Sequence, residues 1–359
     1  MEGTTLRFDE PAGRTYPAAA SHVVTLPEYS SVLIQPGAGL LAPPWTGTGG
    51  VVAFLVRGTL RNDGMLSAST AGLRGGVGQD AIDERGGCMR ADEPAPGGAR
   101  RGEGLAVDSF SSGATGRGAT DTGGGGGMCP FSGGGGGAQR GAGGIGGLAR
   151  DATTVGGNGG RAHPSALLLL GGGGGATNGV GSEARSGGAG GGVVFARALE
   201  VTGFGRIEAH GAPGGDVSSN VGAGSGGGAG GTVWLEVDGE ATCAIGANGG
   251  AGGATTSTGP GGGGGGGFIR VRAGAVVTCP TSVTAGSPGL ANGGPYGAGP
   301  LIPSEAPHAG VVDVVQGEPG PPTTMSPAAH HLSATGCGCA SGPAPWWALG
   351  ALGLRRRRA

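Results

Sequence analysis

The chain has 359 residues and a formal net charge of −2, and 94 of its residues are glycine and 24 are proline. Aromatic residues make up 4% and charged residues 13% of the sequence, so the chain cannot bury a large conventional core and is not a solvated charged tail. The small net charge, without a basic stripe, argues against nucleic acid as a partner. All basic residues are arginine, which excludes a P-loop lysine and a Schiff-base lysine.

The first predicted elements are short strands in residues 1–71, separated by proline-rich turns. Alternating apolar residues predict them at His22–Leu26, Ser31–Gln35, Val51–Leu60 and Met65–Ser69. The opening stretch MEGTTLRFDE has neither a cationic nor an apolar leader region, so no export signal is visible at this end.

Residues 72–190 form a glycine-rich insertion with few strand signals, and a further tract at 261–267 runs directly into the strand-like FIRVRA. A phosphate-binding loop needs glycines between a strand and a helix, whereas these tracts precede a strand and no helical pattern follows. The tracts also lack the strict third-residue period of collagen. We therefore expect no nucleotide and no other cofactor.

The glycine tracts have two interpretations. Seven residues of an extended threefold helix span roughly 22 Å, close to the ~20 Å of a six-residue strand, and backbones without Cβ atoms can approach closely enough to hydrogen-bond laterally. A loose linker is the alternative, because ordering glycine costs more conformational entropy than ordering any other residue. We expect ordered packing.

Three consecutive repeats occupy residues 191–290. GGVVFARALEVTGFGRIEAHG, GGTVWLEVDGEATCAIGANGG and GGFIRVRAGAVVTCPTSVTAG each read as a glycine tract, an alternating strand, a turn and a second short strand, and a similar segment begins at Gly49. Val194, Val233 and Ile269 hold equivalent places, 39 and 36 residues apart. This spacing is typical of a repeated supersecondary unit.

Alternation assigns the two faces of these strands. One parity, which includes Val233 and Ile269, is apolar and should point inward. The other parity aligns Phe195, Trp234 and Arg270 in one row if the strands stack in register. That row is a candidate ligand-facing surface for sugar, and the alternative is an ordinary solvated sheet face.

These patterns predict an all-β fold in which glycine-rich repeat units stack as a parallel β-helix-like or β-sandwich-like structure with extended polyglycine segments. The expected division is an N-terminal β segment (1–71), the insertion (72–190), the β-repeat region (191–290), a disordered Pro/Gly/Ala linker (291–334) and a disordered sorting tail (335–359).

Six cysteines allow disulfides in an exported protein. Cys243 and Cys279 each follow an equivalent inward position, Val233 and Ile269, by ten residues, so neighbouring strands about 4.8 Å apart would bring them within bridging distance. Two buried free thiols are the alternative. Cys88 and Cys129 form a second candidate pair, which no register supports.

No catalytic residue is predicted, and we expect that the protein is not an enzyme. Five of the six histidines, His163, His210, His308, His330 and His331, are scattered without metal-ligand spacing, and no G-x-S-x-G sequence occurs. Asp238 and Glu240 could share one sheet face, as in β-helix enzymes that act on polysaccharides. Any sheet surface carries such pairs.

The last 25 residues read TGCGCASGPAPWWALGALGLRRRRA, with a Gly-Cys-Gly-Cys motif at 336–339, an apolar stretch at 343–354 and an arginine cluster at 355–358. This tail resembles the tripartite sorting signal of myxobacterial surface proteins called MYXO-CTERM. The resemblance implies export, cleavage near Cys337 and Cys339 by a dedicated protease, and anchoring at or release from the cell surface. Twelve apolar residues span only about 18 Å as a helix, less than a bilayer requires.

The repeats also resemble glycine-rich bacterial surface proteins of uncharacterised function and the glycine-rich extracellular domain of the anaplastic lymphoma kinase family. Neither resemblance implies an active site. We expect a surface protein with a structural, adhesive or matrix role. Its expected partners are the processing protease and extracellular polysaccharide or matrix, with membrane contact only through the tail before processing. A carbohydrate-binding module, a polysaccharide-active enzyme and a disordered spacer are the alternatives.

Overall fold

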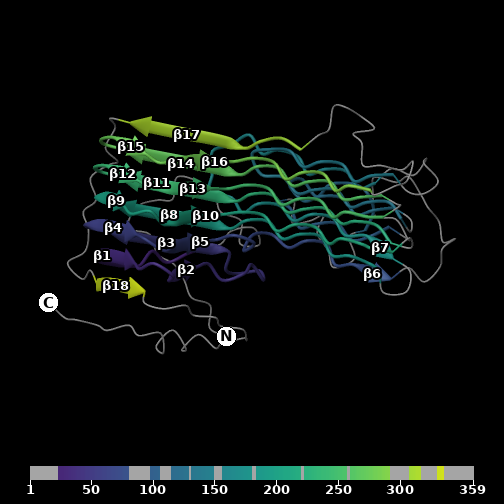
Figure 1. Cartoon of the computed structure of the whole chain (residues 1–359), viewed down its shortest axis with the longest axis horizontal. Helices are drawn as coiled ribbons and strands as arrows, with labels where there is room; N and C mark the ends of the chain where they lie inside the picture. Colours follow the sequence, from purple (N-terminus) through teal and green to yellow (C-terminus); the bar gives the residue numbers. More distant parts are fainter. Residues whose placement is uncertain are drawn as a thin grey trace.

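The computed structural model describes residues 23–80, 98–105, 115–128, 131–148, 156–179, 183–219, 222–256, 259–291, 307–316 and 330–334. In these ranges the protein is all-β, without a helix, and every pair between named strands is parallel. The strands form a nearly closed, barrel-like arrangement at one end of an elongated molecule, and extended glycine-rich segments fill the other end (Figure 1).

The strands fall into three columns, each built from short parallel strands that pair side by side. The first column contains β3 (Val51–Val56), β8 (Val193–Ala198), β11 (Thr232–Val237), β14 (Phe268–Ala273) and β17 (Val311–Gln316). The second contains β4 (Thr59–Asn62), β9 (Glu200–Thr202), β12 (Ala241–Thr242) and β15 (Val277–Thr278). The third contains β2 (Gly39–Leu41), β5 (Met65–Ser67), β10 (Arg206–Glu208), β13 (Ala244–Gly246) and β16 (Thr281–Ser282). We call these three columns, together with β1 and β18, the coil region.

One strand joins two of the columns. β1 (Glu28–Ile34) pairs with β3 at its start and with β4 at its end, so the first two columns belong to a single 11-stranded sheet. β18 (His330–Ala334) pairs with the other edge of β1. The third column forms a separate five-stranded sheet, and β6 (Gln79–Asp80) pairs with β7 (Asn178–Gly179).

The first column keeps the register that the alternating pattern predicts. Val194 pairs with Val233 and Val233 with Ile269, and the pairing continues without a slip along all six residues of each strand. The inward side chains Val233, Leu235 and Ile269 are fully buried in the apolar core that the columns enclose. Since the side-chain period of a strand is two, a slip of one residue would turn this apolar set towards solvent.

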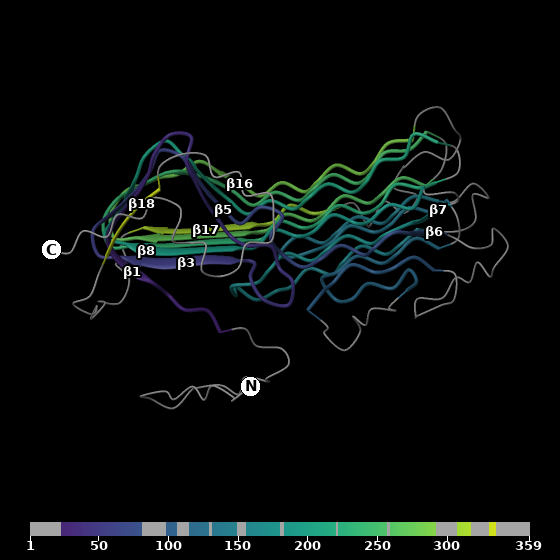
Figure 2. The same cartoon turned by 90° about the horizontal axis from the view of Figure 1, so that it is seen from below.

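The glycine-rich segments lie side by side and hydrogen-bond through their backbones (Figure 2). We call them the polyglycine bundle, which comprises the tracts 72–78, 98–104, 123–127, 133–137, 141–147, 156–160, 171–176, 187–192, 211–217, 222–231, 249–254, 259–267 and 284–289. The tract 133–137 exchanges hydrogen bonds with six others: 123–127, 141–147, 156–160, 171–176, 222–231 and 259–267.

A period of three governs these contacts. Gly134 and Gly137 donate to Gly224 and Gly227 of one neighbouring tract, with N–O distances of 3.1 and 2.9 Å. An extended helix with three residues per turn presents every third residue in the same direction, which produces this spacing. The tracts of the insertion therefore pack directly against tracts of the repeats.

Glycine is required inside the bundle because the backbones are too close for a side chain. A Cβ atom on Gly135 would lie 2.1 Å from the carbonyl oxygen of Asn158. Tracts at the surface of the bundle tolerate side chains at every third place: Ala142, Ile145 and Leu148 are half-buried, and the glycines between them are buried.

Three expectations about the strands need correction. Residues 23–26 form no strand, and the strand expected over 51–60 is divided into β3 and β4 by a turn at Arg57 and Gly58. The segment 291–334, expected to be a disordered linker, contains β17 and β18. The apolar run VVDVVQ of β17 continues the first column, and pairing with β14 outweighs the effect of the surrounding proline and glycine.

Candidate functional site

The structure aligns the predicted row on the outer face of the first column. Phe195 pairs with Trp234, and Trp234 with Arg270, on neighbouring strands. The Arg270 guanidinium lies 4.7 Å from the centroid of the Trp234 ring, a cation–π distance. The Trp234 Nε1–H donates to Glu236 Oε1 at 3.1 Å, and the ring meets Phe268 edge-on at 6.4 Å between centroids.

The row Phe195, Trp234 and Arg270 is half-buried, and the Trp234 ring is already engaged by neighbouring side chains of the same sheet. The indole N–H of Trp234 has a carboxylate partner, and one ring face lies under Arg270. Sugar recognition by an aromatic side chain needs an open ring face. The ligand-facing role of Phe195, Trp234 and Arg270 stays a prediction, and their contacts also suit a purely structural role.

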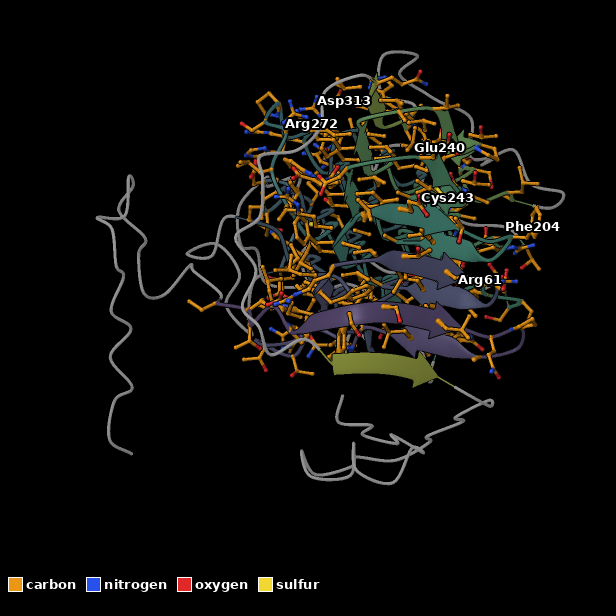
Figure 3. The ribbon with its side chains drawn as sticks, turned by 90° about the vertical axis from the view of Figure 1, so that its left-hand side faces the viewer. Arg61, Phe204, Glu240, Cys243, Arg272 and Asp313 are labelled. Atoms are coloured by element: carbon orange, nitrogen blue, oxygen red, sulfur yellow. A yellow bond between two sulfur atoms is a disulfide. The ribbon has the colours of Figure 1, made fainter. Side chains whose placement is uncertain are left out.

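The charged groups on the same face are paired. Arg197, which is buried, lies 3.3 Å from Asp238, and Arg270 lies 3.4 Å from Asp313 of β17. Arg197, Glu236 and Arg272 lie in register on neighbouring strands and form a row of alternating sign. Cross-strand pairs of opposite charge stabilise a sheet, and they need no catalytic role to explain them. In Figure 3, Arg272 and Asp313 lie on this face, away from Glu240.

Segments that flank the bundle tracts cover one end of this face. The Thr232 hydroxyl donates to the Leu169 carbonyl at 2.7 Å and accepts a hydrogen bond from Gln139 Nε2 at 3.0 Å. The Arg140 guanidinium lies 5.5 Å from the centroid of the Phe268 ring. Neither Gln139 nor Leu169 was foreseen as a contact, because both belong to the glycine-rich insertion.

The two carboxylates considered for catalysis, Asp238 and Glu240, have different surroundings. Asp238 is engaged by Arg197, whereas Glu240, two residues later in the same turn, is exposed. No group of three or more histidine, cysteine, aspartate or glutamate residues that could hold a metal ion occurs within the described ranges. No helix in these ranges is long and apolar enough to cross a membrane.

Of the histidines, His210 has the most specific environment. Its Nδ1 accepts a hydrogen bond from the Asn248 N–H at 2.9 Å, and its Nε2 lies 3.8 Å from Glu208 Oε1. Partial burial lowers the pKa of His210, Glu208 opposes that change and Arg206 adds to it. His210 therefore links one repeat to the next as a neutral acceptor.

Cys243 and Cys279 form a disulfide, with Cα atoms 4.6 Å apart. The bridge joins the turns that follow β12 and β15, which are paired neighbours in the second column. This is the pairing that the equal spacing from Val233 and Ile269 predicts. The other four candidate residues, Cys88, Cys129, Cys337 and Cys339, lie outside the described residues.

One exposed feature was missed by the sequence reasoning. Phe204 is 95% exposed at the turn between β9 and β10. Arg61, in the preceding layer of the stack, pairs with Asp63 at 2.6 Å, and the Phe204 N–H lies 3.4 Å from Asp63 Oδ1. Figure 3 shows Phe204 and Arg61 on the same edge of the molecule. The sequence Gly203-Phe204-Gly205, an aromatic residue between two turn-forming glycines, was the available signal.

Comparison with known proteins finds no match: no family model, no curated protein and no solved structure resembles this chain significantly.

Proposed function

We propose that this protein is a non-catalytic, surface-exported scaffold with a structural, adhesive or matrix role. In this proposal the coil region is a parallel β-helix-like stack of glycine-rich repeats, and the polyglycine bundle is a stiff extension of it. The observation that carries the proposal is the bundle itself, in which the tract 133–137 is hydrogen-bonded to six others.

The bundle supports a mechanical role because its tracts offer few side chains that could bind or react. Its inner tracts expose no side chains, and its cohesion comes from backbone hydrogen bonds, each of which is short and directed. On the outer face of the first column the charged and aromatic groups hold one another. Such an arrangement maintains shape and leaves few groups for catalysis.

Export is proposed from the tail. The Gly-Cys-Gly-Cys motif, the apolar stretch and the arginine cluster at 355–358 resemble the MYXO-CTERM signal, so cleavage near Cys337 or Cys339 would leave the scaffold at or beyond the cell surface. A disulfide between Cys243 and Cys279 is consistent with an oxidising location.

The test is fractionation of the producing cells with an antibody against residues 191–290, followed by intact-mass measurement. We expect the protein in the surface fraction, with a mass that lacks the arginine cluster. Recovery of the chain through Ala359 from the cytoplasm would refute the proposed address. Rapid proteolysis between Val233 and Val271 in the isolated protein would refute the proposed rigidity.

Glycan binding is a second candidate function, supported by the exposure of Phe204 beside the charged side chains of Arg61 and Asp63. An aromatic ring with neighbouring polar groups suits a sugar, which has apolar and hydroxyl faces. A glycan array should detect binding by the native protein and lose it in Phe204→Ala. Leu199→Ala, at another exposed turn position, is the matched control.

A further inference from the structure

The second column carries a polar outer face. Its strands direct Leu60, Val201 and Ala241 into the core, where all three are buried. Because side chains alternate along a strand, the residues between them point outward. These form two rows that run along the stack. We call Thr59, Glu200, Glu240 and Val276 the glutamate row, and Arg61, Thr202, Thr242 and Thr278 the threonine row.

The threonine row repeats at a constant interval, with one residue from each layer. Arg61 pairs with Thr202, and Thr242 pairs with Thr278. Ala241 pairs with Val201, so the next residue, Thr242, lies beside Thr202. Neighbouring strands lie about 4.8 Å apart, so the hydroxyl groups follow one another across the strands at about that interval.

Several polar groups of this face are open, in contrast to the paired charges on the first column. The side chains of Thr242, Thr278 and Glu240 are exposed, and within the described ranges none of them makes an ion pair or a hydrogen bond. Glu200 accepts a long hydrogen bond from the Thr59 hydroxyl, at 3.4 Å. Glu200 and Glu240 are neighbours in one row, and like charges on adjacent strands destabilise a sheet. Their carboxylates are therefore free to accept hydrogen bonds from a ligand.

Phe204 stands at one edge of this face. It follows Thr202 by two residues, in the turn to the third column, and its side chain is 95% exposed. Gly203 before it has a φ of +109°, and a Cβ there would lie 2.1 Å from the Asn62 carbonyl oxygen of the preceding layer. The turn is thus packed closely on the stack and presents the ring to solvent. Figure 3 shows Phe204 on the same side of the molecule as Glu240, away from Arg272.

We propose that this face binds a linear, uncharged polysaccharide that lies along the stack, across the strands. The proposal rests on the glycan-binding function suggested above for Phe204 and extends it from one ring to two rows of polar groups. Sugar hydroxyls donate to the carboxylates of Glu200 and Glu240 and exchange hydrogen bonds with the threonine hydroxyls. The apolar face of one sugar ring packs on Phe204.

The direction of the polysaccharide follows from the length of the strands. β9, β12 and β15 have two or three residues each, so a ligand that ran along one strand would meet one or two outward side chains. Along the stack it meets one residue of each row per layer, from β4 to β15.

The charge of the face determines which polysaccharide fits. Arg61 is paired with Asp63 at 2.6 Å, so the two glutamates leave the face negative. An acidic polysaccharide is therefore repelled, whereas the hydroxyl groups of an uncharged one are suitable donors.

The test is affinity gel electrophoresis of the full chain in gels that contain hydroxyethyl cellulose, galactomannan or polygalacturonate. We expect retarded migration with an uncharged polymer and none with polygalacturonate. Calorimetry with oligosaccharides of the retarding polymer should show an affinity that increases with length until the ligand spans the four layers, about 14 Å at the strand spacing.

Three variants make the test specific. Thr242→Val with Thr278→Val removes two hydroxyls and keeps the β-branched shape. It should lower the affinity for the longer oligosaccharides roughly tenfold, since each lost hydrogen bond contributes a factor of a few. Glu240→Gln removes one carboxylate from the other row and should weaken binding severalfold. Thr284→Val changes an exposed threonine outside this face and should bind like the native chain. Circular dichroism spectra should be the same for all of them.

The outcomes separate this proposal from the functions on which it builds. If Phe204→Ala loses binding while the threonine and Glu240 variants bind every oligosaccharide like the native chain, one sugar is recognised at the ring and the proposed rows are wrong. If no uncharged polymer retards the native chain, or polygalacturonate alone does, the proposal fails. An equal loss of affinity in Thr284→Val would also overturn it. The scaffold function is tested separately by the fractionation described above.

Discussion

The coil region and the polyglycine bundle are held together in opposite ways. In the coil region, side chains alternate between core and surface, and residues such as Leu235 and Ile269 exclude water. In the bundle, the tract 133–137 has no side chains, and its backbone hydrogen-bonds directly to six neighbouring tracts. One half is stabilised by apolar burial and the other by close approach of backbones.

This difference shows how a glycine tract can be ordered although ordering it costs conformational entropy. Glycine loses more conformational freedom on folding than any other residue. Each buried tract in the bundle satisfies its backbone groups in three directions, as its threefold helix requires, and a buried unpaired backbone group would be costly. The coil region provides the fixed strand ends from which several tracts start in register, such as Gly267 before β14.

The largest expected effect is on the bundle. Gly135→Ala would place a Cβ 2.1 Å from the Asn158 carbonyl oxygen, which is itself fixed by the Gly125 N–H. We expect a loss of at least about 4 kcal/mol in the free energy of unfolding, at the far end of single-substitution effects. Chemical denaturation followed by circular dichroism measures it.

Gly39→Ala in β2 is the matched control, because the nearest atom to its Cβ would be a Leu41 side-chain carbon at 3.4 Å. The same chemical change should cost little there. Equal losses in the two variants would contradict the difference between the regions.

The next effect concerns the disulfide of the coil region, because the loop that it closes includes tracts of the bundle. The loop closed by Cys243 and Cys279 has a sequence separation of 36 residues and includes the bundle tracts 249–254 and 259–267. In the chain-entropy model a loop of this length stabilises by about 3–4 kcal/mol. Cys243→Ser with Cys279→Ser should lower the denaturation midpoint accordingly.

Reduction of the native protein should reproduce that change, and reduction of the double variant should do nothing further. A double variant as stable as the oxidised protein would mean that the register alone orders these tracts.

Much of the coil region could be predicted from its sequence, because its information lies in side chains. The parity of Val233, Leu235 and Val237 defines the buried face, and the equal spacing of Cys243 and Cys279 from their inward valine and isoleucine predicts the bridge. The outer contacts of Trp234 with Arg270 follow from the same register.

The bundle could not be predicted in this way. A run such as Gly133 to Gly137 carries no pattern that distinguishes one neighbour from another, so its six partners are decided by where the adjoining strands place it. The hydrogen bonds of Thr232 with Gln139 and Leu169 could not be predicted for the same reason. Phe204 was overlooked since a single aromatic residue in a turn has no period.

A smaller effect is expected in the coil region when a carbon is removed and not added. Ile269→Val removes one methylene from a fully buried side chain, and such deletions cost about 0.5–1.5 kcal/mol. Removing a carbon here should therefore cost less than adding one at Gly135. Hydrogen exchange should show faster opening of β11 and β14, with the tract 133–137 unchanged. Equal acceleration in both regions would show that they unfold as one unit.

The smallest effect concerns pH at the junction of the two regions. Because burial lowers the pKa of His210 below its ordinary value of 6.5, the folded protein holds the ring neutral, with Nδ1 accepting from Asn248. This contribution to stability is complete above pH 6.5. It decreases as the pH falls from 6.5 towards the lower folded pKa, because the unfolded chain takes up the proton first. The facing charges are Glu208, which favours the protonated ring, and Arg206, which opposes it.

His210→Asn is the control that the chain itself suggests. In the next repeat, Asn248 occupies the equivalent place and its Oδ1 accepts from the Thr284 N–H at 2.8 Å. An asparagine at 210 should therefore keep an acceptor for Asn248 and remove the titration. Unfolding measured from pH 7.5 to 5 should show a steeper loss of stability in the native protein than in the variant. If the two curves run parallel, the neutral state of the ring does not contribute to the stability of the junction.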